Sequence, residues 1–197
     1  MSLLLTAIIT LIIGFPIASI VEWCLHKYVL HQRISWYSRP YHAHAEVHHS
    51  VFGPDATYHL QPGQDKWIIT MAWWSVFALV PLGTVPFALC ALSIAWLVGW
   101  PEAWMIILTG ALVIALYYGA YERLHYCMHA PKGRWFERTW LFRWLNGHHL
   151  LHHQHEGGAN YCVVFPFADL TFGTWLKRAT CAFAQVRGPF IRDVQPV

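Results

Sequence analysis

The sequence predicts an all-α integral membrane protein with about three to four transmembrane helices and a cytoplasmic helical cap that carries clusters of histidines. Hydrophobic residues make up 56% of the 197 positions, whereas Asp, Glu, Lys and Arg make up only 12%, about half the share in a soluble domain. Thirteen of the fourteen histidines fall into four short clusters, all outside the longest apolar stretch. These two observations indicate a lipid-embedded scaffold with a metal site at one end.

The first crossing is expected near the amino terminus. Residues 2–21 carry no charge and are long enough to span a hydrocarbon layer of roughly 30 Å. A secretory signal peptide fits poorly, because no charged region precedes the apolar run and no small-residue cleavage site follows it. We therefore expect a retained transmembrane helix.

The second apolar region, 67–121, is predicted to form a transmembrane hairpin. Its only charge is Glu102, and every Lys and Arg lies before or after it. The positive-inside rule then places 22–66 and 123–197 together on the cytoplasmic side. An even number of crossings must separate them, and the length allows two. The outer turn is expected at 99–102, with a kinked or locally unwound helix at Pro81 to Pro86.

The chain therefore reads as one membrane domain with three crossings and an external amino terminus. Residues 1–31 hold the first transmembrane helix and the first histidine box, and residues 32–66 form a cap segment with the second box. Residues 67–129 hold the transmembrane hairpin and the third box. Residues 130–197 form a cap with the fourth box and a tail. A bacterial inner membrane is the expected location. The net charge of +3 includes no basic run, so no nucleic-acid partner is expected.

Helical spacing predicts which histidines share a face. His125 and His129 are four residues apart and should project the same way. His149, His152 and His153 cover about 100° of one helix face and should point into one space. Imidazole is the commonest side-chain metal ligand, so both boxes are typical of metal sites.

The other two boxes are less regular. His44 and His48 should agree in direction, whereas His49 lies about 100° further round and should serve a second ion or another side of the site. His26 and His31 diverge by about 140° on a regular α-helix. Either one of them lies past the helix end, or they bind different metals.

The number of histidines indicates two metal ions. Four to six ligands saturate a transition metal, and an enzyme leaves one position open. The ten candidate ligands are His26, His31, His44, His48, His49, His125, His129, His149, His152 and His153.

These boxes resemble those of the fatty acid hydroxylase and sterol desaturase superfamily of membrane di-iron oxygenases. The matching pieces are His26-x4-His31, His44-x3-His48-His49, His125-x3-His129 and His149-x2-His152-His153, followed by Asn160-Tyr161 and by Asp169-x2-Phe172-Gly173-Thr174. They occur in the family's order over about residues 22–176. The second box departs from the family's H-x2-H-H pattern, with alanine at position 45, and either His148 or His149 could lead the fourth.

The resemblance implies an enzyme that uses two irons and O₂ to hydroxylate an unactivated C–H bond of a membrane lipid, either a fatty acyl chain or a sterol-like molecule. No catalytic residue beyond the metal centre is implied, and zinc could replace iron in purified material. Electrons would come from a separate protein of ferredoxin, rubredoxin or cytochrome type. A lipid desaturase is the nearest alternative. A metal transporter or sensor fits less well, because 67–122 contain no histidine.

Further polar residues near the boxes are candidates for supporting roles. Four histidines remain as accessory ligands: His42, His59, His148 and His155. Two carboxylates precede a box by about one helical turn, where such groups often orient an imidazole, and two further residues belong to the tail motif; these four are Glu22, Glu122, Asn160 and Asp169.

Overall fold

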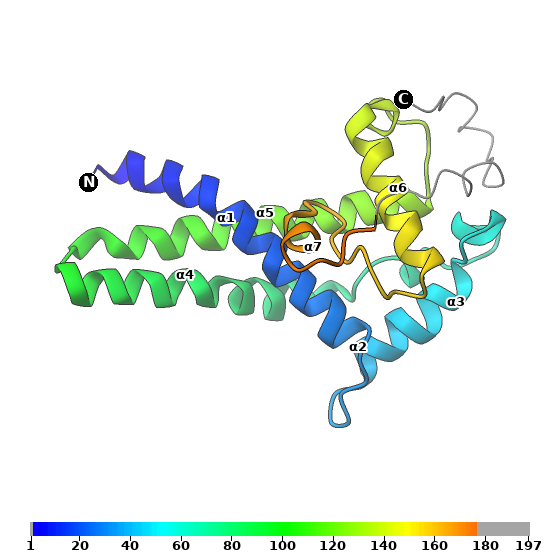
Figure 1. Ribbon diagram of the computed structural model, residues 1–197, viewed down its shortest axis with the longest axis horizontal. Coiled ribbons are helices and arrows are strands. Elements are labelled where there is room, and N and C mark those ends of the chain that lie inside the picture. Colours follow the sequence, from blue (N-terminus) through cyan, green and yellow to red (C-terminus); the bar gives the residue numbers. More distant parts are fainter. Residues whose placement is uncertain (1, 177–197) are drawn as a thin grey trace.

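Three long helices form the body of the molecule (Figure 1). The computed structural model describes residues 2–176, so the end of the predicted cap, 177–197, lies outside the described part. Three helical segments are long and apolar enough to cross a membrane: Leu3–Leu30, Lys66–Val98 and Pro101–His129, of 28, 33 and 29 residues. Each exceeds the roughly 20 residues that a crossing needs. The prediction of an all-helical chain with three helices able to cross a membrane is confirmed, and no strand occurs within 2–176.

The hairpin consists of α4 (Val76–Val98) and α5 (Trp104–His129). Gly99 ends α4 with a φ of 66°, a left-handed conformation that glycine adopts without steric cost. A short 3₁₀ turn, Pro101–Ala103, leads into α5, so the turn lies where the sequence predicted it. A Cβ at Gly110 would lie 2.3 Å from Cγ of Phe87, which shows how closely the two helices approach.

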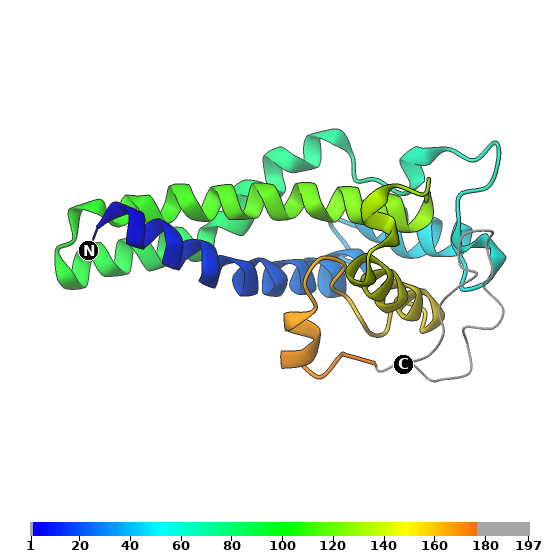
Figure 2. The same ribbon diagram turned by 90° about the horizontal axis from the view of Figure 1, so that it is seen from above.

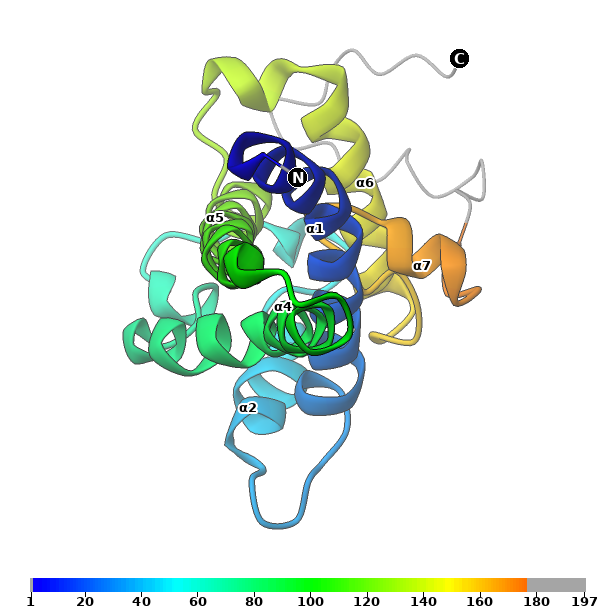
Figure 3. The ribbon, with the colours of Figure 1, turned by 90° about the vertical axis from the view of Figure 1, so that its left-hand side faces the viewer.

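The start of α4 takes one of the two forms predicted for it. The helix continues through Pro81 and Pro86 without unwinding, so the kinked form is found and the locally unwound form is not. Figure 3 shows the first part of α4 running across the direction of the rest, which is the kink that a proline ring produces by clashing with the preceding turn. The irregular stretch lies earlier, where 3₁₀ turns form at Lys66–Ile68 and Trp73–Ser75.

The first helix, α1 (Leu3–Leu25), packs against α5 and continues into a π-helix, His26–Leu30. A second π-helix, His42–His48, lies between the short helices α2 (Arg39–Tyr41) and α3 (His49–Val51). Together with the 3₁₀ turns Ala56–Tyr58 and Trp135–Arg138 and with α6 (Trp140–Gln154), they form a cap at one end of the bundle (Figure 2).

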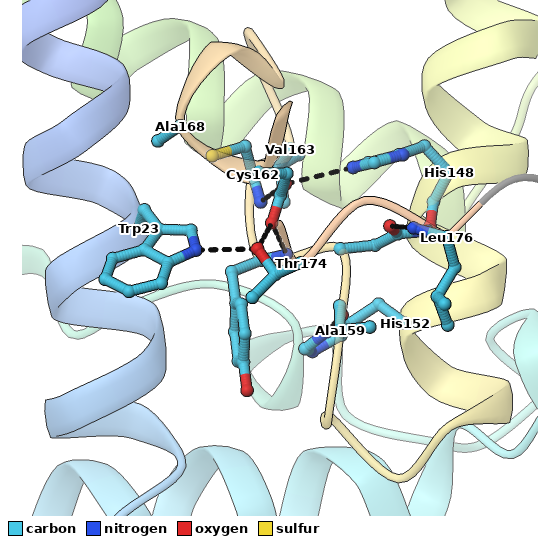
Figure 4. Close-up of polar contacts among 12 residues, drawn as sticks. Trp23, His148, His152, Ala159, Cys162, Val163, Ala168, Thr174 and Leu176 are labelled. Carbon is cyan, nitrogen blue, oxygen red and sulfur yellow. Dashed lines mark hydrogen bonds and ion pairs between the residues drawn. The ribbon is translucent and has the colours of Figure 1, made fainter. Parts of the chain in front are cut away.

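The segment after α6 returns to α1 and includes the short helix α7 (Phe167–Thr171). The indole Nε1 of Trp23 donates a 2.9 Å hydrogen bond to Oγ1 of Thr174 (Figure 4). The backbone N–H of Ala168 donates to Oγ of Ser19 at 3.1 Å. These contacts join the segment that carries the tail motif to the helix that carries the first histidine box.

Candidate metal centre

The ten predicted ligand histidines converge at the cap end of the bundle as two groups of five. In each group the five candidate ligand nitrogens lie within 4.8 Å of one another. Group one comprises His26, His31, His44, His49 and His152, and group two comprises His48, His125, His129, His149 and His153. Each group could hold a metal ion.

Nitrogen spacing in group one suits a shared ion. Nε2 of His44 lies 2.9 Å from Nε2 of His26 and 3.3 Å from Nε2 of His49. Nε2 of His31 and His152 are 3.1 Å apart. Two imidazole nitrogens bound at about 2.0–2.1 Å to one ion are separated by roughly 2.9–3.4 Å in octahedral or tetrahedral geometry. The observed distances fall in this range.

Group two shows the same spacing, and hydrogen bonding alone does not account for it. Nε2 of His149 lies 3.1 Å from Nε2 of both His129 and His153. Nδ1 of His129 contacts the carbonyl of Tyr58 at 2.8 Å, and Nδ1 of His153 contacts the carbonyl of Phe52 at 2.6 Å. A carbonyl only accepts, so both Nδ1 atoms donate and both neutral rings present Nε2 lone pairs. His149 has one Nε2 proton at most and cannot satisfy both.

Two further nitrogens of group two are buried without a hydrogen-bond partner in the described part of the chain, Nε2 of His48 and Nε2 of His125. His48 donates from Nδ1 to the carbonyl of Ile68 at 3.1 Å, which leaves its Nε2 with a lone pair. A buried acceptor without a donor costs about 1–3 kcal/mol, and a bound cation removes that cost. The donor set therefore fits a metal ion.

Backbone carbonyls orient rings of group one as well. Nδ1 of His152 donates to the carbonyl of Ala159 at 2.7 Å, and Nδ1 of His26 donates to the carbonyl of Tyr161. Such contacts fix the ring tautomer and orientation. Five of the ten rings are held in this way, and in each the Nε2 atom is directed toward its group.

The environment keeps these rings neutral and able to bind metal. Burial, aided by neighbouring imidazoles, lowers the pKa of His49 to about 2, and burial lowers that of His31 to about 4. Burial likewise lowers the pKa values of His44, His48, His149, His152 and His153 well below the usual range. At pH 7 these imidazoles are therefore neutral, which is the form that binds a metal ion.

The two π-helices change which histidines share a group. The prediction that His44 and His48 point together, with His49 apart, is wrong: His44 and His49 lie in group one and His48 in group two. In a π-helix the hydrogen bond links residues five apart, so a residue five positions on lies about one turn later. His26 and His31 share group one for the same reason, and His31 lies just past its helix end.

The regular helices match their predictions in part. His125 and His129 on α5 share group two, as predicted. On α6 the three rings do not enter one space, because His149 and His153 belong to group two and His152 to group one. The rings of His149 and His152 lie 5.6 Å apart and nearly parallel, so this helix face spans the boundary between the groups.

His148 is excluded from both groups. Its Nε2 lies 3.1 Å from Oδ2 of Asp169 (Figure 4), so His149 is the group member in this box. Asp169 also accepts hydrogen bonds from the backbone N–H groups of Tyr161 and Cys162 at 2.9 and 2.8 Å. The amide of Asn160 donates to the carbonyl of His148 at 3.2 Å. Both tail residues thus hold the segment whose Tyr161 carbonyl orients His26.

The other accessory candidates also lie outside the two groups. His42 pairs with Glu46 at 2.6 Å on the surface. His155 contacts the carbonyl of Leu151 at 3.0 Å, and His59 packs against the ring of Tyr58. None of the three directs a ring nitrogen into a group.

The two carboxylates expected to orient ligands bond elsewhere. Oε2 of Glu22 accepts from the hydroxyl of Tyr117 at 2.6 Å, and Oε1 accepts from the N–H of Val163 at 2.7 Å. Glu122 accepts from the N–H of Met71 at 3.3 Å. Backbone carbonyls orient the imidazoles instead. The two glutamates connect helices to each other or to loops.

The sequence patterns did not indicate two features of the site: the backbone carbonyls that orient the rings, and a glycine that leaves room for one of them. The carbonyls that orient imidazoles have no side-chain signature. Gly157 has a φ of 74°, and a Cβ there would lie 2.0 Å from Cε1 of His31. The Gly-Gly pair that follows the fourth box was the available signal for a close approach of the backbone.

Comparison with family models, with curated proteins and with solved structures finds no match to this chain.

Proposed function

We propose that this chain is an O₂-dependent lipid hydroxylase that binds one iron in each histidine group. The observation that supports the proposal is the convergence of ten imidazoles from four separate segments into two adjacent groups, with two buried Nε2 atoms of group two left without a hydrogen-bond partner. The groups touch: the rings of His49 and His153 stack with centroids 4.2 Å apart, and those of His44 and His48 at 5.0 Å. Two ions held there would lie next to each other.

Two irons held by these groups would supply the redox chemistry that O₂ activation and cleavage of an unactivated C–H bond require. The chain's own residues have three tasks. Five imidazoles in each group would hold one ion. Backbone carbonyls fix the rings before any metal binds. Burial of all five rings of group two excludes water from the centre.

We further propose that the cap faces the cytoplasm, of a bacterial inner membrane, with the amino terminus outside. Every Lys and Arg lies in 22–66 or 123–197 and none in the hairpin sequence between them, the distribution typical of cytoplasmic segments. A separate electron-transfer protein of ferredoxin, rubredoxin or cytochrome type would reach the centre from that side. The lipid substrate would come from the bilayer.

Lipid mass spectrometry of a bacterial host with and without the gene tests the function. A hydroxylase adds one oxygen to a host lipid, whereas a desaturase of the same type removes two hydrogens. His152→Ala should abolish the product. His42→Ala, which changes an exposed histidine outside both groups, should leave product formation intact. Metal uptake by vesicles without any new lipid would contradict the proposal and favour a transporter.

A further inference from the structure

A pocket between α1, α4 and α5 lies inside the predicted membrane layer and ends at the metal centre. Its wall includes Val21 and Leu25 from α1, Leu79 from α4 and Ile114 from α5. The pocket also contacts His26 of group one. Val21, Leu25 and Leu79 are half-buried, as expected of side chains that line an opening toward lipid.

The pocket is adjacent to both histidine groups. Besides His26, its wall includes Tyr121, whose ring packs at 5.5 Å against the ring of His125 in group two. A molecule in the pocket would therefore contact His26 of group one and Tyr121, which packs on His125 of group two. The other hollow described, beside Trp100 and Trp104, lies at the hairpin turn, at the opposite end of the bundle.

Three polar side chains of the wall, Glu22, Tyr117 and Tyr118, are already hydrogen-bonded within the protein. The hydroxyl of Tyr117 donates to Glu22 at 2.6 Å, and the other oxygen of Glu22 accepts from Val163 at 2.7 Å. The hydroxyls of Tyr118 and Ser75 are hydrogen-bonded at 2.9 Å. Because these polar groups bond within the protein, a ligand in the pocket would meet mainly the apolar side chains of the wall, and an apolar ligand suits such a surface.

The pocket is also narrow. Its volume is about 60 Å³, whereas an apolar cavity that holds benzene measures about 150 Å³. A ring system therefore does not fit beside His26, but a few carbons of an unbranched chain do. The remainder of such a chain would lie along α1 and α4 in the bilayer.

We propose that this pocket binds an unbranched alkyl chain of a lipid and holds it beside His26. The narrow pocket thereby selects lipids with alkyl chains over sterol-like rings. The proposal refines the substrate class of the proposed hydroxylase. Binding itself needs neither metal nor turnover, so it can hold even if the reaction is different.

Photolabelling tests the pocket directly. The full chain in lipid nanodiscs is irradiated with a palmitic acid analogue that carries a mid-chain diazirine, and labelled peptides are mapped. We expect labels within 18–30, 71–79 and 114–121. Leu79→Trp should fill the pocket and lower this labelling by about tenfold, the equivalent of losing about two methylene contacts. Leu89→Trp, at an exposed position of the same helix, should not.

Val21→Phe fills the pocket from α1 and provides a second variant, and the metal content of each variant shows whether the cap is folded. Equal labelling of folded Leu79→Trp, Val21→Phe and Leu89→Trp would overturn the proposal. So would labelling of wild-type protein only outside these three segments, or equal labelling of the pocket by a photoreactive cholesterol analogue. Pocket labelling without any oxidised lipid in the host would refute the hydroxylase function and leave the alkyl site standing.

Discussion

Backbone carbonyls decide the direction of half of the candidate metal ligands. The carbonyls of Tyr58 and Phe52 orient rings of group two, and those of Ala159 and Tyr161 orient rings of group one. Every residue type has a backbone carbonyl, so the sequence predicted the candidate ligands and not the carbonyls that orient them. The spacing of the boxes was informative because an imidazole, unlike a carbonyl, belongs to one residue type.

Asp169 is the residue whose loss should loosen the tail most. Its carboxylate accepts from His148, from two backbone N–H groups and from Oγ1 of Thr174 at 2.7 Å. In Asp169→Asn an amide NH₂, which only donates, replaces one carboxylate oxygen that accepts from these groups. The change should lower the free energy of unfolding by about 3–5 kcal/mol. Thermal unfolding in detergent measures this loss. Glu46→Gln, at an exposed pair, should change it little.

The same carboxylate predicts a pH dependence. Burial raises the pKa of Asp169, but its hydrogen bonds from His148, Thr174, Cys162 and Tyr161 outweigh burial and lower it overall. The folded pKa thus lies below the unfolded value of about 3.9. The stabilisation is complete above that value and lost as the pH falls through the folded pKa. Tryptophan fluorescence of the tail should change below about pH 4 in wild type and lose this transition in Asp169→Asn.

At the scale of elements, the two π-helices explain why α-helical spacing misassigned part of the site. The sequence pattern gives residue positions but not the hydrogen-bond register of a helix. His44 and His49 meet because the register widens at His42–His48. In α5, where the helix is regular, the pairing of His125 with His129 was predictable.

The loop after α6 should control group one separately from group two. Gly157→Ala combines a positive φ with a Cβ that would lie 2.0 Å from the ring of His31, so it should displace that ring and leave about one bound ion per chain. Gly173→Ala is the matched control, because Gly173 has a φ of 69° and open space around it. Metal analysis of the purified variants distinguishes them. Equal metal content in both would show that the contact with His31 is unimportant.

Close approach of α4 and α5 makes a further prediction. Gly110→Val would place side-chain atoms against Phe87, whereas Gly119→Val meets open space on the same helix. Overpacking costs about 1–3 kcal/mol, and small residues set such distances in membranes. We expect a lower melting temperature for Gly110→Val alone. The opposite order would mean that the two helices do not pack as described.

At the scale of the whole molecule, the segment count and the meeting of four boxes followed from charge placement and hydropathy. Hydropathy and charge summed over a segment determine whether it enters lipid, and these sums do not depend on how individual side chains pack. Assignment of each histidine to a group depended on long-range packing, which a local pattern does not contain. The exposed Trp96 and Trp104 flank the hairpin turn, where tryptophan commonly anchors a helix at the membrane interface.

The two ions should differ in how readily they are released. His31 and His49 of group one are partly exposed, whereas group two is buried throughout, and carbonyls hold three of its rings against two in group one. Loss of such a partner typically weakens metal binding 10–100-fold. Treatment with a chelator should remove one ion before the other. Release of both in a single phase would contradict this difference.

Metal stoichiometry tests most directly whether ten histidines hold two ions in two separate groups. Metal analysis should give about two ions per chain in wild type. Changing His31 and His49 to alanine affects group one alone and should leave about one, whereas changing His152 and His153 affects both groups and should leave none. A wild-type protein with a single ion, or a His152/His153 double variant that retains two, would contradict the claim.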